Sequence, residues 1–346
     1  MEKIISIVIP TYNMEKYLNR CVDSLLICKG LDDVEILIVN DGSRDRSSEI
    51  AHCYKSKYPH IVSVIDKLNG NYGSCINEAL SVAVGKYIKI LDADDFFNTP
   101  NFEMLVSSLK NIDSDVVLTN HTIITPKMTK LWKHPYENGR VFDLDLECPK
   151  YFPMHSVLYR TDLLREIKYS QLEGISYTDQ EWIFYPMLVS KKMVYIDIDV
   201  YQYCMDRGGQ TMDPVVFKKN MPALCHILNR ALRYSTTRVS QTSGHRQYCK
   251  MQLFRQAETI YKNILISRDT YEREYDLLRD LDIRIRDSYP ELYYELNNAS
   301  LGYIKYIARF HKSGEGLSFL EIKSLPIQYL MKRVLNAIKR RVSMSL

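Results

Sequence analysis

The sequence predicts an α/β protein that opens with a doubly wound, mostly parallel sheet and continues as a mainly α-helical region. Two observations support this prediction. The first 120 residues alternate short apolar runs rich in β-branched residues with segments of helical periodicity, the pattern of parallel strands covered on both faces. From about residue 215 onward, strand patterns disappear and helical patterns dominate. We therefore expect one domain over residues 1–214 and a helical domain over residues 215–346.

Five apolar runs of strand length define the expected sheet. They are ISIVIP (5–10), VEILIVN (34–40), IVSVID (61–66), YIKIL (87–91) and DVVLTN (115–120). Between the first two runs, the apolar residues at positions 18, 21, 22, 25 and 26 follow helical spacing. In an open doubly wound sheet, ligands bind outside the carboxyl ends of the strands. The segments that follow these runs are therefore the places to look for a site.

Composition and charge exclude several classes of protein. The chain has 346 residues, 46% hydrophobic and 25% charged, and no stretch approaches the roughly 18 apolar residues that a membrane-spanning helix needs. The start MEKIISIVIPTYN has no basic region and soon reaches a proline, so we expect no secretory signal and a cytoplasmic location. Six of the cations lie in residues 322–346 without an acid, which leaves a net charge of 4 − 6 = −2 elsewhere. No broad basic face remains for nucleic acid.

Three carboxylates follow the fourth run, at Asp92, Asp94 and Asp95. Mg²⁺ and Mn²⁺ prefer oxygen ligands and commonly take one or two carboxylates together with substrate phosphates. Residues two apart in a strand share a face, so Asp92 and Asp94 can converge on one cation, and we expect Asp95 to have a structural role. The alternative is a solvated acidic loop.

Three other segments are expected at the same edge. PTYN (10–13) follows the first run, and NDGSRD (40–45) follows the second; there Gly42 allows a tight turn and Asp41 can accept a hydrogen bond from a base or a ribose. NGNYGSCIN (69–77) places two glycines before a helix, where backbone can approach a ligand closely. Each segment alone is also compatible with an ordinary turn.

The order of these pieces is more specific than any one of them. SIVIPTYNMEKYLNRCVDSLL, EILIVNDGSRD, NGNYGSCINEAL and GKYIKILDADD resemble the opening of the inverting nucleotide-sugar glycosyltransferases of the family 2 type. The resemblance covers about residues 4–213 and implies a GT-A-like fold with a Rossmann-like nucleotide-binding core. It implies a UDP-sugar donor whose uracil contacts Asp41, with Pro10, Tyr12 and Asn69 in the nucleotide-sugar site.

The resemblance also assigns the acidic run. DAD, residues 92–94, matches the Asp-x-Asp motif of the family, which implies that Asp92 faces the ribose or the metal shell and that Asp94 ligates Mn²⁺ or Mg²⁺. YCMDRGGQTMDP (203–214) resembles a flexible segment near the diphosphate, where Arg207 or Gln210 would touch phosphate or acceptor. A domain linker is the alternative for this last segment.

The catalytic base is expected near residue 179. EGISYTDQEWIFYPM is similar to the segment in which the family places an acidic Glu-Asp pair, but Thr178 stands at the first position. This departure leaves Asp179 as the single candidate for the general base. Alternatively, Thr178 and Glu181 form a capping box, in which case Asp179 only favours a helix N-terminus and has a low pKa.

The end of the chain carries a further pattern. Apolar residues at positions 327, 330, 331, 334, 335, 338 and 342 form a helical stripe, and Lys332, Arg333, Lys339 and Arg340 lie mainly off it. Such a helix suits an anionic membrane surface, so residues 324–346 are predicted to bind one peripherally at the inner face of the membrane. Packing on its own domain, or on a second subunit of a homo-oligomer, is the alternative.

Together these features predict a metal-dependent, inverting glycosyltransferase. It would move a sugar from a UDP-sugar to a hydroxyl of a glycan or lipid-linked saccharide in surface-polysaccharide or glycoconjugate synthesis. A nucleotidyltransferase should have a Gly-rich, basic phosphate loop in the first turn, and PTYNMEKY is not one. A non-catalytic sugar-nucleotide-binding scaffold should lack the metal-binding acids, which are present here.

Overall fold

The computed structural model describes residues 3–26, 29–205, 214–238, 242–266, 272–318, 320–325 and 328. The chain divides into two compact units, one of residues 1–217 and 239–248 and the other of residues 218–238 and 249–346. Each unit is described by itself. The boundary expected between residues 214 and 215 stays a prediction.

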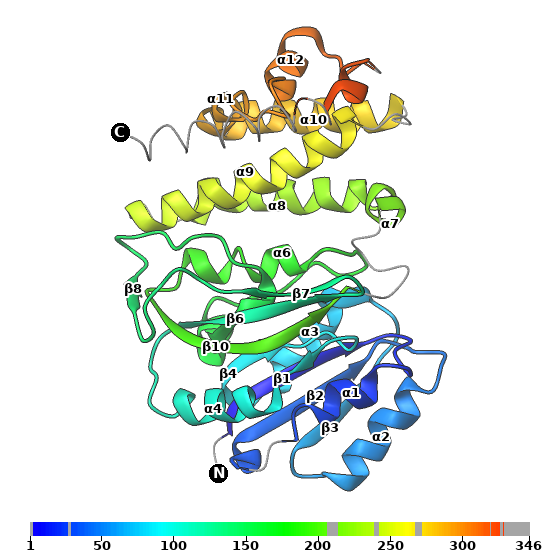
Figure 1. The fold of residues 1–346 in the computed structure, drawn as a ribbon, viewed down its shortest axis with the longest axis vertical. Coiled ribbons are helices and arrows are strands. Elements are labelled where there is room, and N and C mark those ends of the chain that lie inside the picture. The colour runs from blue at the N-terminus through cyan, green and yellow to red at the C-terminus, as the bar shows by residue number, and fades with distance from the viewer. Residues whose placement is uncertain are drawn as a thin grey trace. The chain divides into compact units, whose positions relative to one another are not determined.

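The first unit is built on a ten-stranded sheet (Figure 1). Its strands are β1 (Lys3–Thr11), β2 (Val34–Asn40), β3 (Val62–Asp66), β4 (Gly85–Ile90), β5 (Phe96–Phe97), β6 (Val116–Thr125), β7 (Met128–Trp132), β8 (Val141–Asp143), β9 (Val157–Arg160) and β10 (Lys192–Cys204). Their order is β3-β2-β1-β4-β9-β6-β10-β5, with β7 paired to β6 and β8 paired to β10.

All five predicted strands are present, as β1 to β4 and β6. The first four form a parallel sheet in the order expected of a doubly wound core. Beyond β4 the sheet is mixed, because β9 runs antiparallel between β4 and β6. Strand β10 is parallel to β6, whereas β5, β7 and β8 are antiparallel to their partners. The fold is therefore a mixed GT-A-like sheet with a Rossmann-like first half.

Among the described residues, six helices belong wholly to the first unit. They are α1 (Leu18–Asp23), α2 (Ser47–Lys57), α3 (Asn71–Val82), α4 (Thr99–Leu109), α5 (Thr161–Glu166) and α6 (Asp179–Trp182), with short 3₁₀ turns η1 (Leu31–Asp33), η2 (Met154–Ser156) and η3 (Pro186–Leu188). The predicted stripe is confirmed in that Leu18, Cys21, Val22 and Leu25 are fully buried, although α1 itself ends at Asp23. These residues share one core with Ile5, Ile7 and Ile9 of β1. Burying each large aliphatic side chain contributes about 1.5 to 3 kcal/mol.

The strand directions gather the predicted site residues at one edge. Strands β1, β2 and β4 are parallel, and β4 and β6 are both antiparallel to β9, so these strands and β10 end at the same side of the sheet. Asp41 directly follows β2, and Asp92 lies two residues after the end of β4. The structure thus brings together the segments that the sequence placed at the ligand-binding edge.

The second unit is helical, as the sequence predicts. Its helices are the last part of α7 (Pro214–Lys219), α8 (Met221–Arg238), most of α9 (Ser243–Ile266), α10 (Glu272–Ser288), α11 (Pro290–Leu296) and α12 (Tyr306–Ser313). Except for residues 324, 325 and 328, the predicted basic helix lies outside the described residues. None of the helices within the described ranges combines the length and the apolar composition needed to cross a lipid bilayer.

Candidate active site

Asp41, after β2, is held by residues that follow β3. Its Oδ1 accepts hydrogen bonds from Nζ of Lys67 and from the backbone N–H of Gly70, both at 2.9 Å. The side-chain amide of Asn69 donates to the Asp41 carbonyl at 3.0 Å. Two predicted nucleotide-site residues, Asp41 and Asn69, are therefore in direct contact. Lys67 was missed by sequence reasoning, and its signal was a cation placed directly after a strand at the ligand edge.

The first two turns are joined to one another. The Asn13 side chain accepts a hydrogen bond from the Arg44 backbone at 2.8 Å, and the Asp41 N–H donates to the Thr11 carbonyl at 2.9 Å. Asn13 has a φ of +55°, a conformation that asparagine tolerates better than most residues. Tyr12 lies between these contacts and keeps 41% of its surface exposed.

Aspartates 92 and 95 are fixed to neighbouring tyrosines. Tyr72 donates its hydroxyl hydrogen to Oδ1 of Asp92 at 2.9 Å. The Tyr201 hydroxyl accepts the Asp92 N–H at 3.2 Å and donates to Oδ2 of Asp95 at 2.7 Å. Asp95 is buried and also accepts the Cys204 N–H at 2.7 Å. Asp95 thus ties the acidic segment to β10.

A histidine joins these carboxylates. Ligand atoms of Asp92, Asp95 and His155 all lie within 4.8 Å of one another. Nδ1 of His155 is buried and has no hydrogen-bond partner among the described residues. Burial, with the charges of His121 and Lys89, lowers the pKa of His155, so its imidazole is neutral and can act as a ligand. Burial, and then the negative charges of Asp92 and Asp94, raise the pKa of Asp95. The three carboxylates therefore concentrate negative charge that a cation would neutralise. These donors fit a divalent cation.

Asp94 is not part of this group of three. Its predicted role as a metal ligand stays a prediction. The Asp94 carbonyl accepts a hydrogen bond from Nη2 of Arg20 at 2.6 Å. The Arg20 guanidinium also lies over the Phe96 ring, 4.9 Å from its centroid. Helix α1 therefore holds the backbone of the acidic segment.

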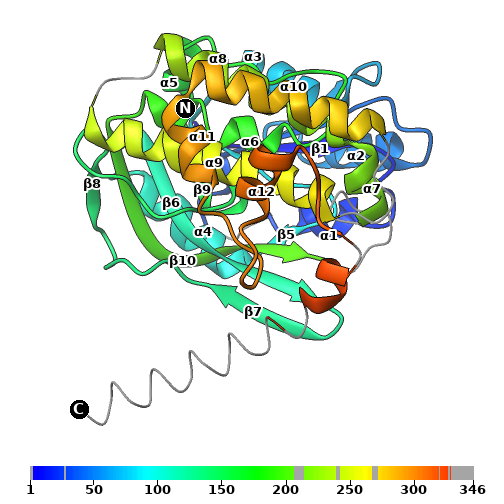
Figure 2. The same cartoon turned by 90° about the horizontal axis from the view of Figure 1, so that it is seen from above.

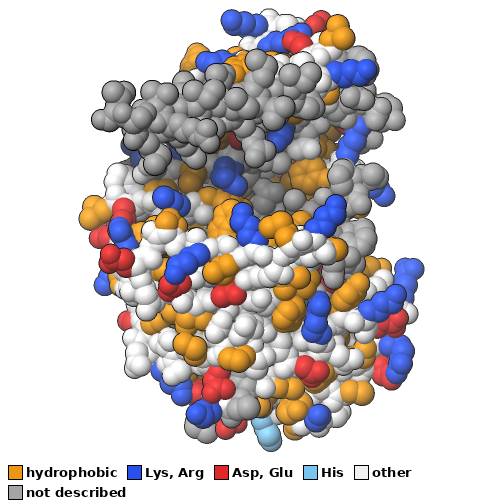
Figure 3. Space-filling model, in the orientation of Figure 1, with side chains coloured by type: hydrophobic (Ala, Val, Ile, Leu, Met, Phe, Trp, Pro, Cys, Tyr) orange, Lys and Arg blue, Asp and Glu red, His pale blue; other side chains and the backbone are white. Residues whose placement is uncertain are grey.

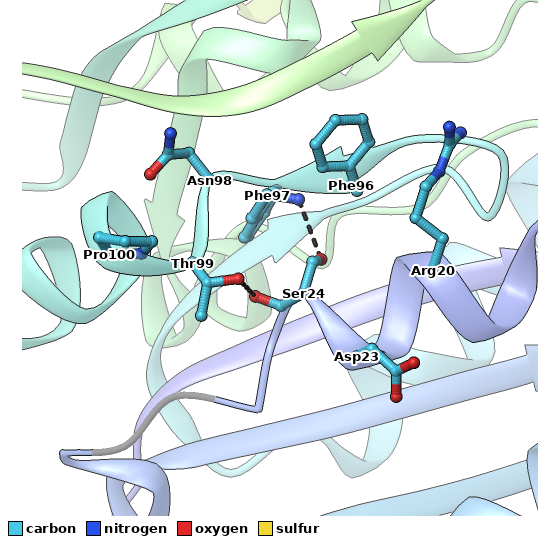
Figure 4. Close-up of a pocket in the computed structure, with 8 residues that line it drawn as sticks. All are labelled: Arg20, Asp23, Ser24, Phe96, Phe97, Asn98, Thr99 and Pro100. Atoms are coloured by element: carbon cyan, nitrogen blue, oxygen red, sulfur yellow. Dashed lines mark hydrogen bonds between the residues drawn. The ribbon is translucent and has the colours of Figure 1, made fainter.

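Arg20 also lines a shallow pocket beside this segment. The pocket lies between α1 and residues 96–100 (Figure 4). Its wall is closed by hydrogen bonds from the Phe97 N–H to the Ser24 hydroxyl and from the Thr99 hydroxyl to the Ser24 carbonyl. None of the three candidate metal ligands lines this pocket. The chemistry is thus expected beside the pocket rather than in it.

A buried lysine positions the turn that carries His155. Lys89 of β4 is fully buried, and its Nζ donates to the carbonyls of His155 at 2.8 Å and of Val157 at 3.3 Å. Burial lowers the pKa of Lys89 to about 7. The sequence showed only a lysine inside an apolar run, and neither Lys89 nor His155 was predicted as a site residue.

The segment before Asp179 is held by α3. The Asn77 side chain accepts the Gln171 N–H at 2.8 Å and donates to the Gln171 carbonyl at 3.0 Å. A Cβ atom on Gly73 would collide with the carbonyl oxygen of Leu172. Gly73 therefore permits close approach of protein backbone, whereas the sequence suggested an approach to a ligand.

The capping box predicted as an alternative is absent from this part of the structure. Thr178 precedes α6 with helical φ and ψ and makes no side-chain capping bond, and its hydroxyl is buried without a partner. The Glu181 carboxylate instead accepts the Leu172 N–H at 2.7 Å. The expectation that Glu181 caps the helix stays a prediction.

Asp179 lies close to the acidic segment. Burial raises its pKa to about 6, although backbone N–H groups partly oppose the shift. The expectation of a low pKa was therefore wrong. After burial itself, the charges of Asp92 and Asp179 are the next causes that raise the pKa of Tyr72, so both carboxylates are near this hydroxyl. Tyr177, two residues before Asp179, has a φ of +68°, which is strained for an aromatic residue. Arg207 and Gln210 lie outside the described residues.

A Rossmann-like core with an Asp-x-Asp segment after β4 and a partly buried carboxylate nearby is the arrangement of a GT-A-like fold. Residues 6–167 match the sequence model of the family described as "Glycosyl transferase family 2". This part of the chain, slightly less than half of it, is therefore similar to a glycosyltransferase family 2 domain.

Individual relatives agree with this assignment. The chain is 33% identical to the uncharacterized glycosyltransferase EpsJ of Bacillus subtilis over 156 residues, which are 40% of this chain and 45% of EpsJ. It is 33% identical to the poly(ribitol-phosphate) beta-glucosyltransferase of Bacillus spizizenii over 214 residues, 60% of this chain and 33% of the relative. The chain thus covers less than half the length of either relative.

A solved structure shares the fold. The crystal structure of S. aureus TarS 1-349 in complex with UDP matches with a TM-score of 0.65 and covers 95% of this chain and 91% of that chain. The sequence identity is 18%, so this likeness concerns the fold.

Proposed function

We propose that the protein transfers a sugar, with inversion, from a UDP-sugar to a hydroxyl of a glycan or lipid-linked acceptor during surface-polysaccharide or glycoconjugate synthesis. The observation that carries this proposal is a carboxylate of raised pKa, Asp179, beside the acidic segment after β4. The UDP in the TarS structure supports the donor class, and the named activity of the Bacillus spizizenii relative supports a surface-polymer acceptor.

The uracil of the donor would bind at Asp41. Both hydrogen bonds to its carboxylate from described residues go to Oδ1, which leaves Oδ2 to accept the N–H of the base. The Lys67 ammonium forms an ion pair with this carboxylate at 2.9 Å, and a carboxylate acts as an acceptor. Pro10 and the exposed ring of Tyr12 would line the same nucleotide pocket, and Arg207 or Gln210 would touch phosphate or acceptor.

A divalent cation would be held by Asp92, His155 and Asp95, with Asp94 as the further ligand predicted from the motif. Carboxylates accept either Mn²⁺ or Mg²⁺, and the imidazole favours Mn²⁺ because Mg²⁺ prefers all-oxygen shells. When bound, the cation would supply positive charge for the diphosphate that leaves.

Asp179 would act as the general base. The acceptor oxygen would form its bond to the anomeric carbon from the face opposite UDP, and its proton would pass to the Asp179 carboxylate. The bond between the anomeric carbon and UDP would break, and its electron pair would leave with the phosphate oxygen of UDP. A pKa of about 6 leaves this carboxylate mostly ionised at pH 7 and more basic than an exposed aspartate. The Tyr72 hydroxyl donates to Asp92, and the charges of both Asp92 and Asp179 act on it.

The direct test measures UDP release from a panel of UDP-sugars, with and without acceptor extracts, in Mn²⁺, in Mg²⁺ and after exhaustive chelation. We expect turnover of one donor class that chelation abolishes and Mn²⁺ restores, with a product of inverted anomeric configuration by NMR. Turnover that survives chelation would contradict the metal requirement. Tight UDP binding without release from any UDP-sugar would favour the non-catalytic scaffold.

A further inference from the structure

Strand β7 is an exposed outer strand of the first unit. It pairs with β6, and all five of its residues are exposed. Figure 2 shows it at the margin of the sheet, next to β6. Its large side chains include Trp132, which is 37% exposed. An exposed aromatic side chain on an edge strand is a candidate for contact with a ligand.

Trp132 is connected to the candidate metal ligand His155. Trp132 lies opposite His121 of β6, and His121 lies opposite Tyr201 of β10. Residues directly opposite share a face of the sheet, so Trp132 is on the face of Tyr201, whose hydroxyl binds the acidic segment. The ring centroids of Trp132 and His121 are 5.7 Å apart, and those of His121 and His155 are 5.6 Å apart. Two ring contacts thus lead from the exposed indole to the site.

Positive charge accompanies this indole. Residues 125–136 contain Lys127, Lys130 and Lys133 and no acid. Lys133 points to the opposite face and pairs with Asp197 at 2.5 Å. Lys130 is exposed, two residues from Trp132 and therefore on the same face. Figure 3 shows lysine or arginine and hydrophobic side chains mixed across the middle of the visible face, over β6 and β7.

We propose that Trp132 and Lys130 form an acceptor subsite for a saccharide that carries a phosphate group. A pyranose ring would stack its C–H groups on the electron-rich face of the indole, and the phosphate would bind the Lys130 ammonium. The proposal rests on the proposed transferase function. Sheet order separates β7 from the donor side, because β7 and the Asp41-bearing end of β2 lie on opposite sides of β4. A substrate on β7 therefore approaches from the side opposite the nucleotide.

A lipid surface fits the strand less well. The Trp132 ring stacks against His121 with an interplanar angle of 22°, so it lies on the sheet rather than projecting into a bilayer. Leu131 and Lys133 face the other side of the strand, and Lys133 is already paired. One indole and one lysine that has no ion pair among the described residues match a single sugar phosphate better than a membrane.

Tryptophan fluorescence reports this subsite directly. The chain has two tryptophans, and Trp182 is fully buried, so acrylamide should quench Trp132 selectively. The probes are 1-phosphates of hexoses and N-acetylhexosamines, each compared with its uncharged methyl glycoside. We expect a 1-phosphate to protect Trp132 from quenching at a concentration at least about tenfold lower than its methyl glycoside. Trp132→Phe should remove the signal.

Two variants that place a glutamate on opposite faces of β7 test the role of Lys130. Lys130→Glu should abolish the preference for the phosphorylated sugar, whereas Thr129→Glu, on the opposite face of the same strand, should retain it. UDP binding should be unchanged in both variants. The experiment needs no turnover, so a chain that releases UDP from no UDP-sugar would disprove the proposed transferase without changing this result.

Three outcomes would overturn the proposal. Protection of Trp132 by no glycosyl phosphate at millimolar concentration would remove the ligand. Wild-type behaviour of Lys130→Glu would mean that the lysines only keep other strands from pairing with this edge. Protection by anionic vesicles, but by no glycosyl phosphate, would assign the strand to a membrane surface.

Discussion

Replacing Asp179 by asparagine separates the two roles that the sequence allowed. Asn keeps the size of the side chain and much of its ability to accept backbone hydrogen bonds, but it cannot take up a proton from the acceptor hydroxyl. If Asp179 is the general base, kcat for UDP release should fall by about 10²-fold or more. If it were only a helix-capping residue, kcat should change little.

The raised pKa predicts the sign of the change in stability. The pKa moves from 3.8 to about 6, and about two units correspond to at most about 3 kcal/mol. Because residue 179 retains some exposure to solvent, which screens the effect, we expect about 1 to 2 kcal/mol. The folded state binds the proton more tightly than the unfolded chain, so this destabilisation is absent below pH 4, grows between pH 4 and 6, and is complete above pH 6. Asp179→Asn should therefore raise the free energy of unfolding at pH 8, which corresponds to an increase of a few degrees in Tm. Near pH 4 it should leave both quantities unchanged.

Differential scanning fluorimetry at the two pH values and initial rates of UDP release test both effects. The matched control is Asp162→Asn, in the first turn of α5, where the side chain is 76% exposed. It should alter neither kcat nor Tm. In the wild type, kcat/KM should rise with pH through about 6 as the base of the free enzyme ionises. A variant with near-normal kcat and a lowered Tm at pH 8 would refute the reasoning and return Asp179 to a capping role.

Three further predictions concern the metal, the loop and the tail. His155→Ala should weaken Mn²⁺ binding about 10-fold or more, the range typical of a lost ligand or supporting contact. Isothermal titration calorimetry without nucleotide measures this affinity, and an unchanged value would exclude His155 as a metal ligand. Gly73→Ala should displace the loop before Asp179 and lower both kcat and Tm, whereas Ser81→Ala, exposed on the same helix, should do neither. Removing residues 324–346 should abolish salt-sensitive co-sedimentation with anionic liposomes and leave turnover of a small soluble acceptor unchanged. If the truncation instead unfolds the protein or dissociates a dimer, the helix packs against protein.

The parallel half of the fold could be predicted because its signals are local. Uninterrupted β-branched runs identified β1 to β4 and β6, and parallel strands necessarily end at one edge. That geometry alone placed Asp41 and Asn69 together, although 28 positions separate them in the chain. Strand β9 was missed because four residues, VLYR, carry too little periodicity to be distinguished from a loop.

The residues that sequence reasoning missed depend on long-range contacts. His155 belongs to no motif and reaches the carboxylates only because Lys89, 66 positions earlier, holds the backbone of its turn. Tyr72 was inside a quoted segment, but its bond to Asp92 crosses from α3 to the end of β4. Such contacts follow from tertiary packing, and no spacing rule in a single sequence encodes them.

The pKa of Asp179 shows why a local rule was wrong at this position. A helix N-terminus stabilises a carboxylate by about 0.3 to 1 kcal/mol, and α6, with four residues, supplies only a small part of a helix dipole. Removing a carboxylate from water disfavours its charge by more than that, so burial determines the direction of the shift. Burial is a property of the tertiary structure, which the four-residue pattern around Asp179 does not encode. It is burial that raises the pKa of Asp179 to about 6, so this carboxylate is basic enough to accept a proton near neutral pH.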